Sequence, residues 1–277
     1  MTLIEVLKVI VFGIIEGFAE WLPVSATGHM MLIDEMISPD MSDEFKNVFL
    51  AMIRLGAVAA VVIMNLKKLY PFYPGKKPEQ RNATLLLWAK IAVAAVPAGI
   101  LGLFLDNWIS AHLYNDVVVA STLIIYGVLL ILVEERNRFA IPAINRLGRI
   151  SFQTAFYLGV FQCLALIPGT SRSGAMILGA LLMGIARPQA VEFSMYAGIP
   201  VIVGSGLLRL IGYGQSMSLP EIGYILIGAL TAFAVSLYSV GFMMNWVRNN
   251  NFKLFGSYRI VLGTLVILWF TVSSLMR

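Results

Sequence analysis

The sequence predicts an all-α polytopic membrane protein, with six transmembrane helices and two re-entrant helical hairpins arranged as an inverted-topology repeat. Three observations lead to this prediction. Hydrophobic residues make up 59% of the 277 residues and charged residues only 13%, which is about half the charged fraction of a soluble domain. Apolar runs of about 18 to 24 residues recur, and each is long enough to cross a hydrocarbon layer of ~30 Å. The connections between these runs alternate between basic and acidic composition.

Six of the apolar runs are predicted to span the membrane completely. They are Phe45–Leu66, Leu85–Leu105, Val117–Val133, Ala190–Ile211, Ile222–Trp246 and Gly256–Leu275. Three connections, residues 67–81, 136–149 and 248–253, are rich in lysine and arginine and are therefore expected on the cytoplasmic side. The connections between them carry acidic residues, which fits the opposite side.

Two further apolar regions comprise residues 3–37 and 152–185. With the six spans in this alternation, the residues before Phe45 lie on the outer side and both ends of the second region lie on the cytoplasmic side, so neither region is expected to cross the membrane completely. Each contains a turn of proline, glycine, serine and threonine, and irregular backbone is tolerated at membrane depth only when it is buried in protein or lines a cavity. We therefore predict two re-entrant hairpins that enter from opposite sides. The single membrane domain, residues 1–277, then divides into repeat 1, residues 1–135, and repeat 2, residues 150–277. The alternative, eight plain spans with accidentally similar motifs, would make the charge alternation a coincidence.

Composition also restricts the partners. The single cysteine, Cys163, excludes an internal disulfide and a thiolate metal cluster. The net charge of +5 is explained by the cytoplasmic loops, so no nucleic-acid partner is expected. Residues 1–8 lack the basic start of a signal peptide, and the N-terminal segment is expected to be retained. Membrane lipid is the expected surrounding, and the sequence leaves open whether a homodimer forms.

Two carboxylates in the first hairpin are candidates for chemistry. Glu16 and Glu20 are four residues apart and project from one face of a helix. A charged residue at the centre of an inserted helix costs about 2.5–3.5 kcal/mol, so we expect the pair to bind a divalent cation or to act as a general base. The alternative is that they pair with Arg54 or Arg172 only to hold helices together.

The two turns resemble each other and each precedes a helix. Residues 22–28 read LPVSATG and residues 167–174 read IPGTSRSG. Helix N-termini present unpaired N–H groups that bind phosphate-like anions, so the two ends are expected to grip a diphosphate between them. The residues expected to contact it are Thr27, Gly28, Thr170, Ser171, Arg172, Ser173 and Gly174. Arg172 supplies a guanidinium suited to bidentate phosphate contacts. Ordinary helix capping is the alternative role of the serine and threonine residues.

His29 lies in the first polar turn and suits proton transfer near neutral pH. The alternative is a buried histidine with satisfied hydrogen bonds. The other histidine, His112, falls in a predicted outer loop and is assigned no role.

The residues around these candidates closely resemble a known signature. EGFAEWLPVSATGH at residues 16–29 is similar to the EGxxEFLPVSSTGH motif of the bacterial undecaprenyl diphosphate phosphatases, also called bacitracin-resistance proteins, and residues 168–174 match the family's PGxSRSG motif. The resemblance implies an all-helical enzyme of the bacterial inner membrane, with its site facing the outer side. It would hydrolyse undecaprenyl diphosphate, a polyprenyl diphosphate lipid, to the monophosphate, recycling the carrier for cell-wall synthesis and giving bacitracin resistance. The implied catalytic residues are Glu16, Glu20, Ser25, His29 and Arg172, with Mg²⁺ or Ca²⁺ held by Glu16 and Glu20.

The chain departs from the family pattern at two positions that matter for the chemistry. Ala26 replaces a second serine that is often assigned as the nucleophile, and an alanine cannot attack phosphorus. Either Ser25 or Thr27 serves instead, or water attacks directly, or the chain is an impaired or engineered lipid-diphosphate binder. Arg54 stands where the family usually has glutamine, which adds a charge beside the expected cavity.

Two other classes of protein share features with this sequence. A lipid-phosphate transporter or flippase is the main alternative, because inverted repeats are a transport architecture. The acid phosphatases that form a phosphohistidine need a histidine downstream of the arginine motif, and none follows Arg172.

Overall fold

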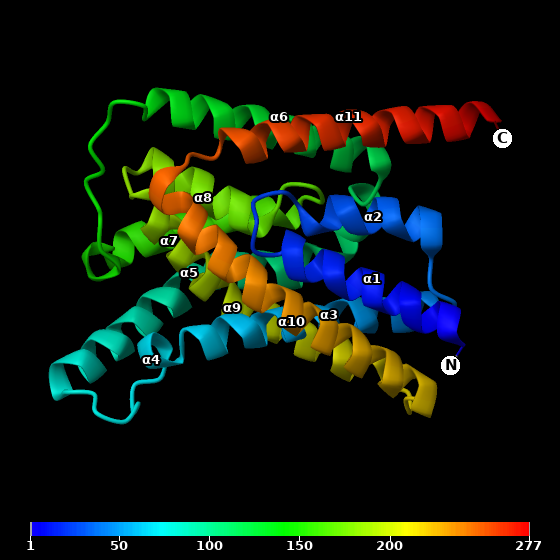
Figure 1. The fold of residues 1–277 in the computed structure, drawn as a ribbon, viewed down its shortest axis with the longest axis horizontal. Coiled ribbons are helices and arrows are strands. Elements are labelled where there is room, and N and C mark those ends of the chain that lie inside the picture. The colour runs from blue at the N-terminus through cyan, green and yellow to red at the C-terminus, as the bar shows by residue number, and fades with distance from the viewer. Residues whose placement is uncertain (1, 277) are drawn as a thin grey trace.

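The computed structural model describes residues 2–276, and no β-strand occurs within that range. The described chain is almost entirely helical (Figure 1). Its long helices are α3 (Asp43–Met64), α5 (Pro78–His112), α6 (Asp116–Arg136), α9 (Arg187–Tyr213), α10 (Leu219–Asn249) and α11 (Lys253–Met276). Its short helices are α1 (Leu3–Ala19), α2 (Ala26–Ile37), α4 (Leu66–Leu69), α7 (Phe152–Cys163) and α8 (Arg172–Leu182), with 3₁₀ turns at Leu147–Arg149 and Leu164–Leu166. The all-α prediction is confirmed.

The six long helices are each apolar and long enough to cross a membrane, and each contains most of one predicted span. The predicted number of spans is therefore confirmed. The helices differ from the prediction mainly at their ends, because polar residues prolong them beyond the apolar run. The span predicted at Leu85–Leu105, for example, forms the centre of Pro78–His112.

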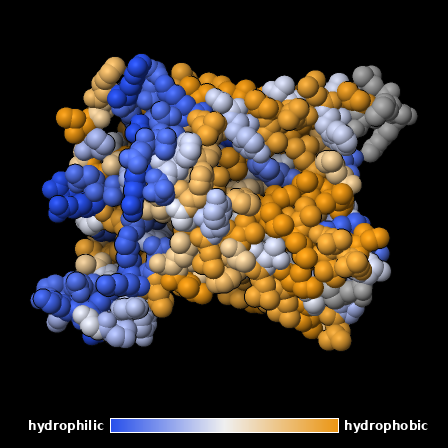
Figure 2. Space-filling view, in the orientation of Figure 1, coloured by the Kyte–Doolittle hydropathy of each residue, from blue (hydrophilic) through white to orange (hydrophobic). Residues whose placement is uncertain are grey.

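The surface has the distribution expected of a membrane protein. Figure 2 shows hydrophilic residues gathered at the end of the molecule where the connections after α3 and α6 lie, and a broad apolar surface beyond them. Large apolar side chains are strongly exposed, including Phe104 (80%), Leu103 (68%) and Val117 (67%). Soluble proteins rarely expose contiguous apolar surface of this extent. The chain is a multi-pass membrane protein.

Four short helices form two helical hairpins, in which α1 packs against α2 and α7 packs against α8. At ~1.5 Å per residue, α1 is about 26 Å long and the other three are shorter still, less than the ~30 Å hydrocarbon layer. Each pair packs against helices of the other half of the chain, because α1 lies along α10 and α7 lies along α5. This crossed arrangement is what an inverted repeat would produce. The re-entrant placement and the repeat remain predictions.

Close packing of α6 against α11 depends on one glycine in each helix. A Cβ on Gly127 of α6 would lie 2.7 Å from the carbonyl oxygen of Gly256 on α11, and a Cβ on Gly256 would lie 2.7 Å from that of Gly127. Because both contacts are with backbone, the two helices can approach only where neither residue has a side chain. The pair α6 and α11 runs side by side at the top of Figure 1.

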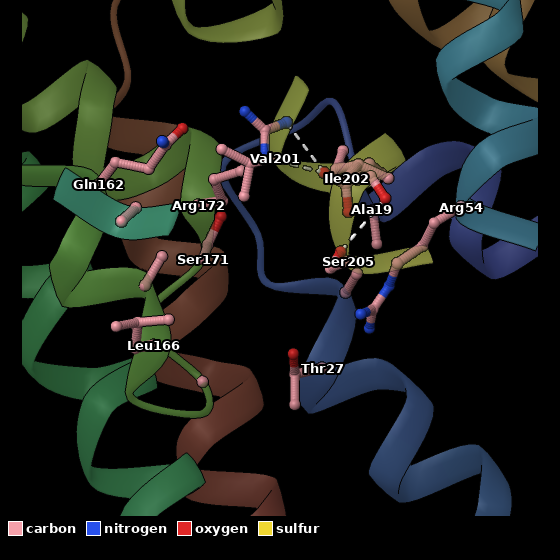
Figure 3. A pocket seen from close by; sticks show the side chains of 15 residues that line it. Ala19, Thr27, Arg54, Gln162, Leu166, Ser171, Arg172, Val201, Ile202 and Ser205 are labelled. Carbon is pink, nitrogen blue, oxygen red and sulfur yellow. Dashed lines mark hydrogen bonds and ion pairs between the residues drawn. The ribbon is translucent and has the colours of Figure 1, made fainter. Parts of the chain in front are cut away.

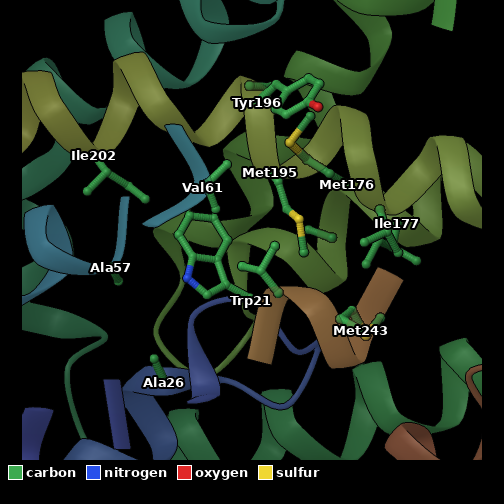
Figure 4. Packing of buried hydrophobic residues seen from close by; sticks show 14 of the residues in the cluster. Trp21, Ala26, Ala57, Val61, Met176, Ile177, Met195, Tyr196, Ile202 and Met243 are labelled. Atoms are coloured by element: carbon green, nitrogen blue, oxygen red, sulfur yellow. The ribbon is translucent and has the colours of Figure 1, made fainter. Parts of the chain in front are cut away.

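The turn between α1 and α2 is buried in the protein core. Trp21 in this turn has no exposed surface, and its indole Nε1 donates a hydrogen bond of 3.0 Å to Ser236 Oγ. Figure 4 shows the ring surrounded by apolar side chains, with Val61 and Met195 beside it. The buried ring ties the turn to the long helices, so the turn keeps one conformation.

Candidate active site

Two serines have the same unusual backbone conformation in the two turns. Ser25 (φ 72°) and Ser171 (φ 70°) are the non-glycine residues with positive φ within residues 2–276. Each caps the helix that follows, because its Oγ accepts a hydrogen bond from the N–H three residues later, Gly28 or Gly174. Left-handed backbone costs a non-glycine residue about 1–3 kcal/mol and occurs most often at functional sites. The matched strain makes the two turns the leading candidates for the site.

Arg172, the first residue of α8, connects the two turns. Its Nε and Nη2 donate to Glu20 Oε1 at 3.2 and 2.9 Å, and its Nη1 donates to the carbonyl oxygen of Ser194 on α9 at 2.7 Å. Glu20 directly follows α1, so an ion pair joins residues 152 positions apart. The guanidinium is therefore held by Glu20 on one side and by the Ser194 carbonyl on the other. Glu20 and Arg172, which the sequence singled out as candidate site residues, are in direct contact.

Gly198 makes room for this guanidinium. A Cβ at position 198 would lie 2.1 Å from Arg172 Nη1 and 2.2 Å from its Cζ. No side chain fits there without moving the guanidinium, so the glycine is required by close approach.

Glu16 lies one turn before Glu20 and is completely buried. Its Oε1 is 3.6 Å from Arg54 Nε on α3, which makes an ion pair. Neither carboxylate oxygen of Glu16 has a hydrogen bond, and Arg54 Nε has none either. An unsatisfied buried charge of this kind is costly and marks a site that a further ligand could complete. Glu16, Glu20, Arg54 and Arg172 together form a cluster of two carboxylates and two guanidinium groups, which has no net formal charge.

A polar cavity of about 170 Å³ opens between the two turns. Figure 3 shows Arg172 and Arg54 on different sides of it, with Thr27 at the start of α2 and Ser171 at the second turn. The other lining residues are Ala19, Glu20, Ala26, Ala98, Gln162, Ala165, Leu166, Gly169, Val201, Ile202 and Ser205. The cavity therefore brings together Glu20, Thr27, Ser171 and Arg172 among the sequence-predicted residues.

Other predicted residues lie behind the cavity wall. Ser25 and Thr170 have no exposed surface, and Gly28 and Gly174 receive the serine caps. Ser173 is buried as well, and its Oγ donates to the carbonyl oxygens of Glu20 (3.3 Å) and Leu22 (3.4 Å). These five residues shape the two turns and do not line the cavity.

His29 faces away from the cavity. Its Nδ1 is 2.8 Å from the carbonyl oxygen of Ser25, and its Nε2 is 2.6 Å from the hydroxyl of Tyr258 on α11. A carbonyl can only accept, so Nδ1 carries a proton, and in the neutral ring Nε2 accepts from the tyrosine. The two rings are stacked with centroids 5.6 Å apart. His29 lies at the first turn, as its position in the sequence requires, but the sequence could not predict that its ring would point away from the cavity and toward Tyr258.

Arg259 is a site residue that the sequence analysis missed. It has no exposed surface and donates to the carbonyl oxygens of Gly169 (2.9 Å), Thr170 (3.0 Å) and Pro23 (3.3 Å). These carbonyls belong to both turns, so one side chain on α11 holds the two turns together. The signal was present, because a lone arginine within the apolar run 256–275 is costly and is functional by default.

These features define a multi-pass membrane protein with a polar cavity, next to a charge-balanced cluster of four side chains, where two strained serine turns meet. Residues 9–265 match the family described as bacitracin resistance protein BacA, and the chain belongs to that family. The motif resemblance is therefore confirmed. The chain is 47% identical over 267 residues to an undecaprenyl-diphosphatase of Enterococcus faecalis, covering 96% of this chain and 97% of the relative. It is 46% identical to an undecaprenyl-diphosphatase of Acetivibrio thermocellus, with 97% and 98% covered, and 45% identical to one of Desulfitobacterium hafniense, with 99% of each covered.

Proposed function

We propose that the chain hydrolyses undecaprenyl diphosphate to undecaprenyl phosphate and inorganic phosphate. The observation that carries the proposal is the cavity in which Arg172, held by Glu20 and Ser194, faces Thr27 and Ser171. A planar guanidinium and a helix N-terminus on each side suit a diphosphate group. The relatives that share 45–47% of their residues with this chain over almost their full length are named for that activity.

The hydrolysis consumes one water molecule and breaks the bond between the bridging oxygen and the terminal phosphorus. Arg172 stabilises the charge on the phosphoryl oxygens as the bond breaks, because fixed donors in a dry site require no reorganisation. Glu20 is the carboxylate that lines the cavity, and it removes the proton of the attacking oxygen. His29 does not face this space, and its hydrogen bond to the Ser25 carbonyl gives it the role of holding the first turn in place.

The attacking oxygen comes from a group that reaches the cavity. Ser25 is buried and its Oγ caps α2, whereas the Thr27 side chain lines the cavity. Position 26 also lines the cavity but carries only a methyl group. Attack by Thr27 or by water activated by Glu20 therefore fits the chain better than attack by Ser25. Attack by Thr27 would form a phosphothreonine and release undecaprenyl phosphate, and water would then hydrolyse the phosphothreonine to inorganic phosphate.

Glu16 and Glu20 would hold a divalent cation. The unsatisfied Glu16 carboxylate supports this, because Mg²⁺ and Ca²⁺ prefer such oxygens. Among residues 2–276 no cluster of three or more histidine, cysteine, aspartate or glutamate side chains could hold a metal. Water and the diphosphate would then supply the other ligands, as is usual for Mg²⁺. The cation would neutralise charge on the diphosphate.

Removing divalent cations is expected to lower phosphate release at least tenfold, since the carboxylate pair would then repel the substrate. Chelation with EDTA followed by titration of Mg²⁺ or Ca²⁺ measures this, and thermal stability with each cation gives a readout without substrate. Glu16→Gln serves as the control, because it should abolish any stabilisation by the cation. Full activity in EDTA would remove the cation from the mechanism.

We place the chain in the bacterial inner membrane with the basic connections on the cytoplasmic side and the cavity reached from the outer side. The surface in Figure 2 supports an orientation with one polar end, because connections 66–81 and 137–150 gather there. Protease cleavage of these connections in inside-out but not right-side-out vesicles is the expected result.

The function is tested with purified protein in proteoliposomes that contain undecaprenyl diphosphate. Phosphate release without movement of the lipid between leaflets supports the phosphatase. Lipid movement without phosphate release would instead identify a transporter and would overturn the proposal.

Ala26→Ser is expected to raise kcat about tenfold or more, because a hydroxyl would then project into the cavity at the first residue of α2. Ala165→Ser is the matched control, since Ala165 also lines the cavity but belongs to the 3₁₀ turn Leu164–Leu166 and to neither serine turn. No gain from Ala26→Ser would show that attack by Thr27 or water is already efficient.

Gly198→Ala is expected to lower kcat/KM for undecaprenyl diphosphate by about 10²-fold, the scale of losing one fixed donor to the developing charge. The new methyl group must displace the Arg172 guanidinium, which lies 2.1 Å from its position. Gly204→Ala on the same helix is the control, because a Cβ there meets no atom within 4 Å. Equal activity of the two variants would contradict the positioning of Arg172 described above.

A further inference from the structure

A second guanidinium lines the polar cavity and has no role in the hydrolysis described above. Arg54 on α3 contacts Glu16 as an ion pair, with its Nε 3.6 Å from Oε1. It donates no hydrogen bond to any of residues 2–276, and its Nε is a buried polar atom without a partner. The other arginines near the turns differ, because Arg172 donates three hydrogen bonds and Arg259 donates four. Arg54 therefore keeps its donors available for a ligand.

The free side of Arg54 faces the beginning of α2. Figure 3 shows its guanidinium pointing from α3 toward Thr27. The Arg54 side chain is 37% exposed, although the preceding residue, Ile53, is fully buried. Within residues 2–276, the Thr27 hydroxyl and the N–H groups of Ala26 and Thr27 also have no hydrogen-bond partner. A cation and the start of a helix thus face each other, and this arrangement suits a phosphate-like anion.

Arg54 can turn toward an anion at a lower cost than Arg172. The Arg172–Glu20 pair has two hydrogen bonds, of 2.9 and 3.2 Å, whereas the Arg54–Glu16 pair has none at 3.6 Å. A guanidinium without hydrogen bonds gains them when an anion arrives and has none to break first. The cavity also has the room, because its volume of about 170 Å³ is more than ten times the ~10–15 Å³ that one water molecule requires.

We propose that Arg54 and the start of α2 form a subsite that binds inorganic phosphate, and that this subsite makes the protein sensitive to its own product. The inference rests on the proposed function, because the hydrolysis releases phosphate in this cavity, and it adds a regulation of that site. Phosphate bound next to Arg54 takes the place of one phosphate group of the next substrate molecule. Inorganic phosphate is therefore a competitive inhibitor of this chain.

The first measurement is the binding of radiolabelled inorganic phosphate to the purified full-length chain, in EDTA and without lipid substrate. Arg54→Gln removes the charge, keeps a polar side chain, and is expected to weaken binding about tenfold or more, because a charge-assisted contact is lost. Lys46→Gln is the matched control on the same helix, since Lys46 is paired with Asp34 and does not line the cavity. It should leave the affinity unchanged.

Glu16→Gln is expected to have the opposite effect. It removes the carboxylate that attracts Arg54, so phosphate affinity in EDTA should rise about threefold or more. The rise should disappear when Arg54→Gln is already present, because the effect acts through the guanidinium. Arg54→Lys gives a further variant if Arg54→Gln does not fold, since an ammonium lacks the planar fork and should weaken binding about threefold or more.

No phosphate binding by the wild-type chain, equal affinity in wild type and Arg54→Gln, or an equal loss in Lys46→Gln would overturn the proposal. Failure of the proposed function looks different, because undecaprenyl diphosphate would then release no phosphate while the binding measurement would still decide on the subsite. With an active protein, the inhibition constant of inorganic phosphate should rise in Arg54→Gln by the same factor as its dissociation constant. An inhibition constant that stays unchanged would overturn the regulatory role.

Discussion

Arg172→Ala is expected to lower kcat/KM for undecaprenyl diphosphate by about 10³-fold or more. Removing one fixed donor to developing charge typically costs ~10²–10³-fold, and this side chain also carries a full charge. In the wild-type protein the Arg172 guanidinium donates to Glu20 Oε1 at 2.9 and 3.2 Å. The substitution removes this positive charge, so the Glu20 carboxylate would repel the phosphates. Phosphate release and affinity for a non-hydrolysable diphosphate measure the two effects.

Arg172→Lys separates charge from geometry. A lysine keeps the charge but cannot contact both Glu20 and the Ser194 carbonyl with a planar fork, so most of the loss should remain. Arg209→Ala is the control, because Arg209 forms an exposed ion pair with Asp106 at the end of α9. Unchanged diphosphate affinity in Arg172→Ala would remove the residue from the site.

Arg259→Met is expected to have the largest effect on stability. It leaves the carbonyl oxygens of Gly169, Thr170 and Pro23 without a donor in a buried place, and each such group costs about 1–3 kcal/mol. A loss on the order of 3 kcal/mol or more should lower the Tm clearly. The one cysteine, Cys163, is half-buried, so a thiol-reactive dye reports unfolding in detergent.

Arg259→Lys tests positioning separately from folding. A single ammonium cannot reach carbonyls in both turns, so the variant is expected to fold at 25 °C and yet to lose at least tenfold in kcat. A purely structural arginine would lower the Tm and leave kcat of the folded protein unchanged. That result would contradict the role assigned to the residue.

The sequence predicted the helices well because their lengths follow from the lipid layer. The apolar runs gave six spans, and the helix pairs α1–α2 and α7–α8 lie within the predicted limits 3–37 and 152–185. The similar motifs of the two turns, residues 22–28 and 167–174, also predicted that Glu20 and Arg172 would lie at one site. These inferences depend on composition and on motif position, which a linear sequence contains.

Side-chain direction could not be predicted in the same way. Ser25 has a positive φ, and in the helix that follows it Ala26 and Thr27 line the cavity while His29 contacts Tyr258. The residue types of the segment VSATGH do not specify this backbone conformation. The contact of Arg259 with both turns likewise arises only when α11 packs on α6. Distances between residues far apart in sequence come from helix packing, so the three-dimensional structure was needed to find them.

The measurement that tests the central claim most directly is an experimental structure with a methylene-bridged polyprenyl diphosphate. The bisphosphonate is expected between the two serine turns, with its oxygens within hydrogen-bond distance of Arg172 and Thr27. Bisphosphonate bound away from both turns, with the Glu20–Arg172 ion pair unaltered and the cavity walls undisturbed, would contradict the site.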